Sequence, residues 1–339
     1  MLNDDKRLLK SMAAWSSDSR TLALAFTLKT WGSAPRPVGS MLAISDNGEF
    51  EGSVSGGCVE NSVIEESKEV IITGDPKRLT YGVPDDTAWS LGLPCGGTIE
   101  LLLIRLNDQA FAQTLIQKSP TTLCVQLSTG RMAIGQSGDW SGELAQESEF
   151  SQIRENLIDS AHVDTQLNEE LDIFVRPFAD PWRLLIVGAV HIAQPLSTMA
   201  SLAGFQVTII DPRAAYLTAE RFPDLPLVND WPDAALSGLK PEEQTAVVEL
   251  SHDYKIDDPA LHAALSSPAF YVGALGSRRN HNRRVERLLQ GGVTADQIKR
   301  IHAPIGLDIG GSSAGEIAVS VIAQLIGSRN KRLSVESAD

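Results

Sequence analysis

Two loops in the first half of the chain place a cysteine beside paired glycines. One reads Gly56-Gly57-Cys58 and the other reads Cys95-Gly96-Gly97. Paired glycines adopt positive φ and let backbone amides approach a ligand closely. Cys58 stands at the predicted N-terminus of a helix, where unpaired N–H groups and the helix dipole favour thiolate over thiol. A thiolate beside open amides suits a soft metal, a sulfur-transfer step or an anion.

The structural alternative for either loop alone is a small buried cysteine beside a tight turn. Two such loops in one domain of a cysteine-poor chain favour a function. The third cysteine, Cys124, lies in the apolar run Thr122–Leu127 and is expected in the core. Three cysteines are too few for a disulfide framework, so we expect reduced thiols. A structural zinc ion needs four Cys or His ligands at short spacings, and the first half adds only His162 to the cysteines. No structural zinc site is expected there.

A turn of the dinucleotide-binding kind opens the second half. The segment from Gly188 to Ala193 follows a predicted strand and opens a helix, and Asp211 ends the next strand. In a dinucleotide fold the first glycine makes the turn, the second admits the pyrophosphate, and the acid binds a ribose hydroxyl. Here Val190 takes the second position and would crowd a pyrophosphate. The pattern predicts a Rossmann-type fold and leaves nucleotide binding open. His191 could donate to a phosphate or pack beside the turn.

Two further glycine-bearing turns precede helices in the second half. The first, within 271–284, loads a helix N-terminus with four arginines, including Arg279 and Arg283. Cations there oppose the helix dipole, which is easier to understand if an anion binds between amides and guanidinium groups. The alternatives are a solvated basic face and a dock for an acidic partner. The second turn, within 303–316, ends in a capping-box spacing.

These turns should meet if the second half is a doubly wound sheet. Ligands of such sheets bind beyond the carboxyl ends of the strands, so the turns at 188, 276 and 310 could line one anion-accepting cleft. In the first half, Arg36 stands between two prolines on a loop. It could reach a phosphate or carboxylate, or simply belong to the surface.

Composition narrows the class of protein. The 339 residues carry 29 basic and 43 acidic side chains, a formal net charge of −14, which argues against nucleic acid and anionic membranes as partners. No apolar run approaches the ~20 residues that a membrane span needs. The first residues lack the apolar core of a signal peptide, so we expect a cytoplasmic protein.

The pattern of elements predicts two domains, 1–180 and 181–330, followed by a flexible tail over 331–339. An acidic stretch over 139–172 holds ten Asp or Glu and one Arg, and two nearby prolines then mark the boundary. The first domain mixes strands and helices, with a hairpin signal at Asn47-Gly48. The second alternates strand and helix. The predicted fold class is α/β, an N-terminal α+β domain followed by a Rossmann-like doubly wound parallel-sheet domain.

Taken together, these segments resemble the xanthine dehydrogenase accessory factor family of the XdhC/CoxI type. The resemblance lies in residues 32–60, 93–101, 184–213 and 271–311, in the family's order and across both domains. It implies a cytoplasmic chaperone that binds molybdenum cofactor (molybdopterin). Such a protein holds the cofactor while a cysteine desulfurase supplies the sulfido ligand. It then delivers the cofactor to a molybdenum hydroxylase apoenzyme such as xanthine dehydrogenase.

Carried onto this chain, the resemblance makes Cys58 and Cys95 the thiols that would contact the cofactor and its molybdenum. It implies an accessory protein rather than a turnover enzyme, and it requires the two cysteine loops to converge on one accessible pocket. The family usually has Gly where this chain has Val190, which weakens nucleotide binding. One rival is an NAD(P)-linked oxidoreductase that uses the second domain. The other is a ligand-free adaptor, suggested by the acidic stretch. Homo-oligomerisation is plausible because such folds often pair through helices.

Overall fold

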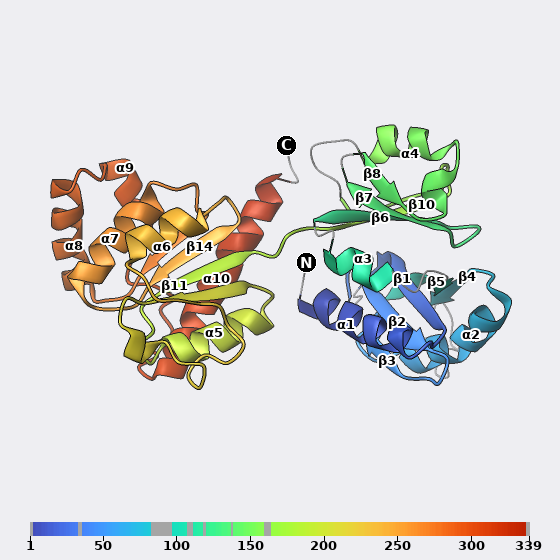
Figure 1. Cartoon of the computed structure of the whole chain (residues 1–339), viewed down its shortest axis with the longest axis horizontal. Helices are drawn as coiled ribbons and strands as arrows, with labels where there is room; N and C mark the ends of the chain where they lie inside the picture. The colour runs from blue at the N-terminus through green and yellow to red at the C-terminus, as the bar shows by residue number, and fades with distance from the viewer. Residues whose placement is uncertain are drawn as a thin grey trace. The chain divides into compact units, whose positions relative to one another are not determined.

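The computed structural model divides into two compact units, residues 1–180 and 181–339 (Figure 1). Each unit encloses its own hydrophobic cores. The mixed α/β fold class is confirmed, with antiparallel sheets in the first unit and a parallel sheet in the second. The structure describes residues 3–32, 36–82, 97–106, 111–117, 120–136, 138–158 and 164–336.

One antiparallel sheet of the N-terminal unit has the order β3-β2-β1-β5-β4. The predicted hairpin at Asn47-Gly48 is confirmed, because it joins β2 to its antiparallel neighbour β3. Gly48 has φ +86°, the left-handed region that this turn requires. The strands are β1 (Leu22–Trp31), β2 (Met41–Ser45), β3 (Phe50–Gly52), β4 (Lys77–Tyr81) and β5 (Thr98–Leu106).

Helix α2 (Glu60–Thr73) covers one face of this sheet. Its buried Val63 and Val70 pack against alternate residues of β1, β2 and β5. Gly74 ends the helix at φ +82°, and its N–H donates to the carbonyl of Val70, so this glycine is the C-cap of α2. Two other helices, α1 (Asn3–Ser17) and α3 (Phe111–Gln117), pack on the opposite face.

A second antiparallel sheet of the same unit has the order β8-β7-β6-β10-β9. It packs on the first sheet through a shared core, in which the rings of Phe26 and Phe174 lie 5.7 Å apart. Its other face carries α4 (Phe150–Leu157) and the fully buried Cys124, so this cysteine is a core residue as expected. Burial raises the pKa of the Cys124 thiol. The strands are β6 (Thr121–Gln126), β7 (Met132–Gln136), β8 (Asp139–Ser141), β9 (Gln166–Asn168) and β10 (Ile173–Phe178).

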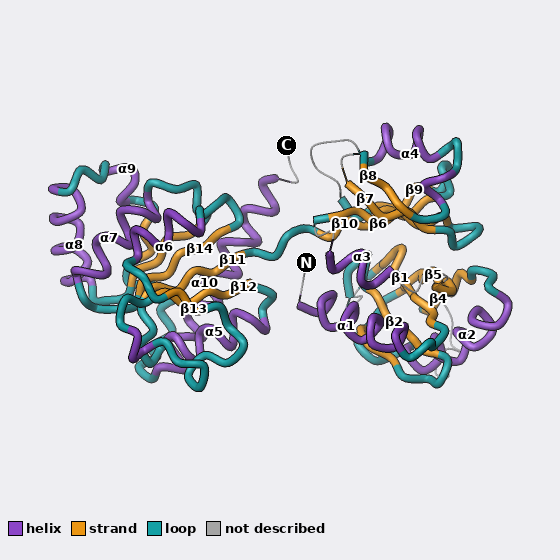
Figure 2. The backbone as a smooth tube through the Cα atoms, in the orientation of Figure 1, coloured by secondary structure: helices purple, strands orange, loops and turns teal. Residues whose placement is uncertain are grey.

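The C-terminal unit is a parallel six-stranded sheet with helices on both faces (Figure 2). Its order is β13-β12-β11-β14-β15-β16, so the chain reverses direction across the sheet between β11 and β14. Helices α5 and α10 cover one face, and α6, α7 and α8 cover the other. The strands are β11 (Arg183–Val187), β12 (Gln206–Ile210), β13 (Leu227–Val228), β14 (Thr245–Glu249), β15 (Tyr271–Ala274) and β16 (Ile301–His302).

The C-terminal unit ends in a long helix, α10, which runs through Glu336. The flexible tail expected over 331–339 stays a prediction. Among the described residues no helix is long and apolar enough to cross a membrane. The helices are α5 (Ala193–Leu202), α6 (Pro232–Leu239), α7 (Tyr254–Leu265), α8 (Arg278–Gln290), α9 (Ala295–Ile298) and α10 (Ala314–Glu336).

A buried ion pair ties the two antiparallel sheets and α1 together. The Arg176 side chain of β10 is 9% exposed, and its Nη2 donates to Asp5 Oδ1 at 2.7 Å. Its Nε donates to the carbonyl of Gly39 at 2.6 Å. Removing one partner of a buried pair leaves an uncompensated charge in a medium of low dielectric constant.

We therefore expect Asp5→Asn to destabilise the protein by about 3–5 kcal/mol. Urea unfolding of the full chain, followed by far-UV circular dichroism, measures this change. Asp4→Asn is the matched control, because Asp4 lies on the same helix, is 60% exposed and meets Arg36 only at 3.4 Å. Its cost should stay below about 1 kcal/mol. Equal effects of the two variants would contradict a special role for the Asp5–Arg176 pair.

Candidate functional site

One end of the first sheet collects the candidate segments of the N-terminal unit. Strand register places Trp31, the last residue of β1, opposite Thr98, the first of β5. Met41, the first residue of β2, and Gly52, the last of β3, lie at the same end. The loop that bears Arg36, the loop that bears Cys58 and the entry to β5 through Gly97 therefore all leave this end of the sheet.

Two of the predicted residues, Cys95 and Gly96, lie outside the described residues. Gly97 is described and is buried next to the first residue of β5. The convergence of the Cys58 and Cys95 thiols therefore stays a prediction.

The loop over 53–59 holds the Cys58 side chain in solvent. Cys58 is exposed, whereas Val54, Ser55 and Val59 beside it are buried. Gly56 and Gly57 have φ +82° and +116°, a backbone conformation that other residues rarely adopt. The turn therefore depends on this glycine pair for its shape.

The amides of this loop are bound within the protein. The carboxylate of Glu60, which is 6% exposed, accepts hydrogen bonds from six donors. Its Oε1 accepts from Ser53 Oγ at 2.6 Å, and its Oε2 accepts from the Ser55 hydroxyl. Four backbone amides complete the shell: Val54 (3.2 Å), Ser55 (3.0 Å), Gly57 (2.9 Å) and Val59 (3.2 Å).

The two remaining amides of the loop bind serine hydroxyls. Gly56 N donates to Ser53 Oγ at 2.8 Å, and Cys58 N donates to Ser55 Oγ at 2.9 Å. The expectation of open amides beside Cys58 is therefore wrong, because every amide from 54 to 59 already has an acceptor. Burial raises the pKa of Glu60, but the hydrogen bonds from Ser53, Ser55 and the backbone outweigh it and lower that pKa to about 2.

Arg36 is anchored to the start of this loop. Its Nε donates to the Ser53 carbonyl at 3.3 Å, and its two terminal nitrogens lie 3.4 Å from Asp4 Oδ2. The structure thus brings Arg36 and the Cys58 loop together, as the placement of both at one end of the sheet requires. The sequence reasoning missed Glu60. An acidic residue in the first turn of a helix that follows a serine-rich loop was the available signal.

In the C-terminal unit, Gly188 makes the predicted tight turn after β11. Its φ is +100°, and a Cβ there would lie 2.8 Å from Ser251 N, so only glycine fits against the loop after β14. His191 is exposed in the following turn, and Val190 is half-buried.

Asp211 follows β12 as predicted but is closed to a ribose. It is fully buried, and each carboxylate oxygen accepts two hydrogen bonds from the protein. Oδ1 binds the Arg213 backbone N–H (2.9 Å) and Nε (2.8 Å), and Oδ2 binds Arg213 Nη2 (2.7 Å) and Ala189 N (2.8 Å). Burial raises the pKa of Asp211, but the hydrogen bonds from Arg213 and Ala189 leave it below its usual value.

Glu316 likewise accepts hydrogen bonds from backbone amides, in the turn before α10. The predicted capping box with Ser313 is confirmed, since Glu316 N donates to Ser313 Oγ at 3.3 Å. The Glu316 carboxylate accepts from the amides of Ser312 (3.0 Å) and Ser313 (2.9 Å). These hydrogen bonds lower the pKa of Glu316. Among the described residues, the glycine-bearing turns at Gly57, Gly188 and Gly310 are therefore each occupied by a carboxylate of the chain itself.

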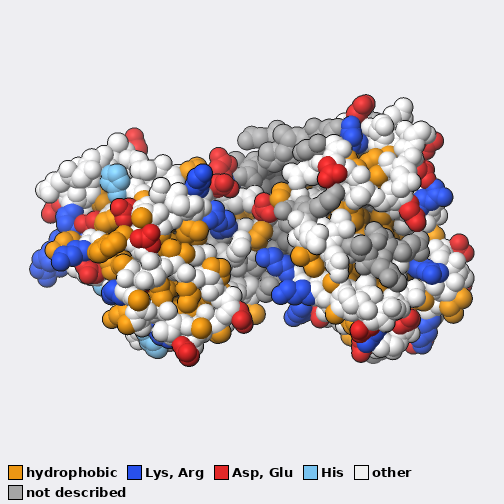
Figure 3. Space-filling view, in the orientation of Figure 1, with side chains coloured by type: hydrophobic (Ala, Val, Ile, Leu, Met, Phe, Trp, Pro, Cys, Tyr) orange, Lys and Arg blue, Asp and Glu red, His pale blue; other side chains and the backbone are white. Residues whose placement is uncertain are grey.

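The arginines of α8 face two ways. Arg278, Arg279 and Arg283 are exposed, and Lys and Arg side chains gather over this end of the unit in Figure 3. Arg284 instead turns inward and is 4% exposed. The three exposed arginines keep their guanidinium groups in solvent, as the predicted anion site would require.

A buried acid pair surrounds Arg284 at the carboxyl end of β14. Arg284 Nη2 lies 3.1 Å from Glu249, 3.5 Å from Asp257 and 2.9 Å from the Leu275 carbonyl. Ser251 donates its N–H to Glu249 at 2.6 Å and its hydroxyl to Asp257. Burial, and then the neighbouring Asp257, raise the pKa of Glu249 above its usual value. Sequence reasoning missed this cluster, because Arg284 lies 27 residues from Asp257 and 35 residues from Glu249 in the chain.

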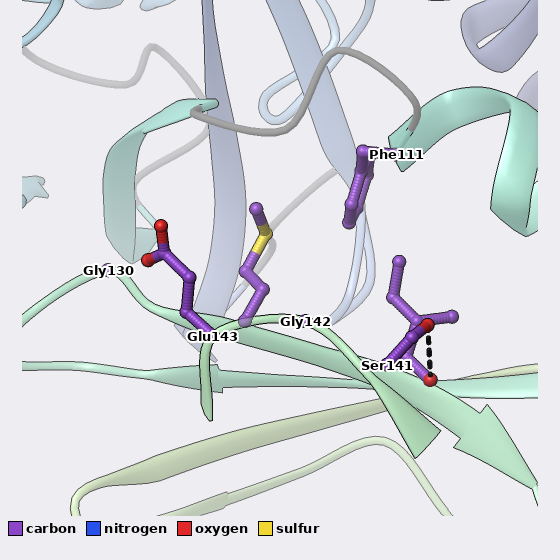
Figure 4. A pocket seen from close by; sticks show the side chains of 7 residues that line it. Phe111, Gly130, Ser141, Gly142 and Glu143 are labelled. Carbon is purple, nitrogen blue, oxygen red and sulfur yellow. Dashed lines mark hydrogen bonds between the residues drawn. The ribbon is translucent and has the colours of Figure 1, made fainter. Parts of the chain in front are cut away.

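A small pocket of about 30 Å³ lies elsewhere in the N-terminal unit (Figure 4). Its lining includes Phe111, Met132 and Ile134, with Ser141 Oγ donating to the Ile134 carbonyl at 3.3 Å. None of the candidate residues lines this pocket. Within the described part of the chain, no three His, Cys, Asp or Glu side chains gather as metal ligands.

Comparison with known proteins identifies relatives over nearly the whole chain. Residues 15–82 match the XdhC and CoxI family, and residues 184–325 match the XdhC Rossmann domain. A Bacillus subtilis (strain 168) protein, named as a probable subunit of xanthine dehydrogenase, is 27% identical over 335 residues. That match covers 94% of this chain and 96% of the relative. Molybdenum cofactor insertion chaperone PaoD of Escherichia coli (strain K12) is 28% identical over 330 residues, covering 96% of this chain and 89% of PaoD.

The fold is also found in a solved structure. A crystal structure of a xanthine dehydrogenase from Bacillus halodurans aligns with a TM-score of 0.80 and 27% sequence identity. The alignment covers 97% of this chain and 96% of the other.

The cluster of Arg284, Glu249 and Asp257 predicts opposite effects on stability for replacement of the arginine and replacement of one acid. Arg284→Met leaves two buried carboxyls without a counter-charge and should cost about 3–5 kcal/mol. Glu249→Gln should be tolerated at neutral pH, because one carboxylate still faces Arg284. Because the folded-state pKa of Glu249 is raised, its contribution is present below its ordinary value of 4.5 and is lost as the pH rises.

The stability of Glu249→Gln relative to the wild type should therefore increase as the pH rises above about 4.5. Urea unfolding over a pH series measures this difference. The exposed Arg283→Met is the control for Arg284→Met and should change stability by no more than about 0.5 kcal/mol. A Glu249→Gln variant that loses relative stability with rising pH would contradict the assignment.

Proposed function

Because the chain belongs to the XdhC and CoxI family, we propose that it is a maturation chaperone for a molybdenum hydroxylase. Its cargo is molybdenum cofactor. In this proposal the protein holds the cofactor while a donor of the cysteine desulfurase class supplies the terminal sulfido ligand. It then delivers the cofactor to the apoenzyme of a hydroxylase such as xanthine dehydrogenase.

The observation that carries the proposal is the exposed thiol of Cys58 on an ordered loop. Its sulfur lies in solvent, while the hydroxyl and amide donors around it are bound within the protein. Molybdenum and dithiolene sulfur are soft partners, and thiolate is a soft protein ligand. The loop can therefore hold the metal end of the cofactor without contributing a general acid or base.

The second thiol of the proposal is Cys95. The chain enters β5 through Gly97 at the same end of the sheet from which the Cys58 loop departs. In the proposal, the Cys95 thiol contacts the cofactor together with Cys58, and two thiol contacts bind it more tightly than one.

The oxidoreductase rival finds little support in the C-terminal unit. All four hydrogen-bonding positions of the Asp211 carboxylate are occupied, and Val190 stands where a pyrophosphate needs glycine. We expect no change in NADH fluorescence when the protein is added. Saturable binding of NADH would favour the rival.

Cys58→Ala should reduce the molybdenum retained per chain by about tenfold, which corresponds to ~1.4 kcal/mol of binding free energy. The measurement is molybdenum by mass spectrometry and oxidised pterin fluorescence, on protein extracted from a molybdenum-competent host. Cys95→Ala should give a similar loss.

Cys124→Ala is the control, because Cys124 is buried in the core of the second sheet. A Cys58→Ala, Cys95→Ala double variant that retains the wild-type amount of cofactor would refute the role of the cysteines. Absence of any pterin from the wild type, together with stable capture of a partner, would favour the adaptor.

The exposed arginines of α8 enter the proposal as the anion-binding group. Replacing Arg279 and Arg283 together with Gln should weaken binding of the cofactor or of the apoenzyme by about tenfold at low ionic strength, and by less at high salt. Lys299→Gln is the control, since its side chain is 76% exposed at the end of α9. Unchanged binding of both cofactor and apoenzyme in the double variant would contradict an anion-binding role for these arginines.

A further inference from the structure

The Cys58 loop is built as an anion-binding cup that is already filled. We define the cup by its six donors: the amides of Val54, Ser55, Gly57 and Val59 and the hydroxyls of Ser53 and Ser55. Successive amides that point into one concavity are a common way for proteins to bind phosphate. Here the group in the concavity is the carboxylate of Glu60, the first residue of α2.

We propose that Glu60 is the positioning residue for the Cys58 thiol, and that its carboxylate decides which end of a ligand this loop can take. The inference rests on the proposed function, in which Cys58 contacts the cofactor. It adds a role for a residue that itself stays 6% exposed.

The first argument is mechanical. With Gly56 and Gly57 at positive φ, the loop has little intrinsic stiffness, because glycine has the largest conformational freedom of any residue. Hydrogen bonds to an ionised acceptor are roughly twice as strong as those between neutral groups. Six of them converge on one carboxylate that helix α2 holds in place. Without that carboxylate, the buried amides of Val54 and Ser55 would lose their acceptor, which folded proteins avoid.

The second argument concerns specificity. Because the amides from 54 to 59 all have acceptors inside the protein, an incoming phosphate would have to displace Glu60 to use them. The low pKa of Glu60 shows how strongly these donors favour its ionised form. What the loop presents to solvent is the sulfur of Cys58. The loop is therefore suited to the thiophilic end of a ligand, and a phosphate has to be bound elsewhere.

The experiment replaces Glu60 with Ala in the full chain and follows amide hydrogen exchange in the 53–60 segment. Loss of the charge-assisted hydrogen bonds should accelerate exchange by at least about tenfold. An excess of sodium formate should slow it again, because formate supplies the missing carboxylate, whereas sodium chloride at equal ionic strength should not. Molybdenum retained per chain should fall with the loss of protection and recover in part with formate.

Two controls accompany the Glu60→Ala exchange experiment. Glu65→Ala removes a carboxylate from the same helix whose side chain is 70% exposed, and it should change neither exchange nor cofactor retention. Inorganic phosphate added to the wild type should leave exchange over 54–59 unchanged. Slower exchange of these amides in phosphate would show that the cup is open and would overturn the specificity claim.

The positioning role is overturned by unchanged exchange in Glu60→Ala. It is also overturned if exchange accelerates while the cofactor is fully retained. If Glu60→Ala does not fold, Glu60→Gln keeps the side-chain volume and one acceptor, and the same measurements decide the question. The proposed function is tested separately by Cys58→Ala, which removes the thiol but none of the six donors. Loss of cofactor in Glu60→Ala with retention in Cys58→Ala would refute the thiol contact while leaving the filled cup in place.

Discussion

The interaction on which this structure depends is the capture of backbone amides by the chain's own carboxylates. Glycine-rich turns before helices leave N–H groups that need an acceptor, because an unpaired buried donor is costly. In this protein Glu60, Asp211 and Glu316 each supply that acceptor within the chain. The turns therefore have the backbone shape of anion sites, while the anion belongs to the protein.

Because of this constraint, the two units present different chemical groups to a ligand. In the N-terminal unit, the amides of the loop bind acceptors within the protein, Glu60 among them, and the loop exposes Cys58. In the C-terminal unit, saturation of Asp211 by Arg213 and Ala189 removes the carboxylate that a dinucleotide would need. The Rossmann-like sheet is thus present with its Asp211 carboxylate bound by protein donors, and fold alone does not fix function.

Much of the fold could be predicted because the strongest signals were local. The apolar run after Pro181 and the small turn at Gly188 identify the first βα unit without tertiary information. The strands β4, β8, β9, β13 and β16 were not predicted. Each has two to five residues. In β4, for example, exposed and half-buried residues alternate at the edge of its sheet. Such strands exist through pairing with a neighbour, which a single segment does not encode.

The sequence by itself determined the division into a mixed α/β unit and a parallel-sheet unit, the family resemblance and the chemical types at the site, since these depend on residue identity and short spacing. It also identified Cys124 as core and Ser313 with Glu316 as a helix cap. Tertiary structure alone decided that the amides beside Cys58 are occupied, that Asp211 faces Arg213, and that Arg284 lies between Glu249 and Asp257. The physical reason is that hydrogen-bond satisfaction is a property of position in space. The sequence of a glycine-rich turn is the same whether the bound anion is a solute or a carboxylate in the first turn of the helix that follows.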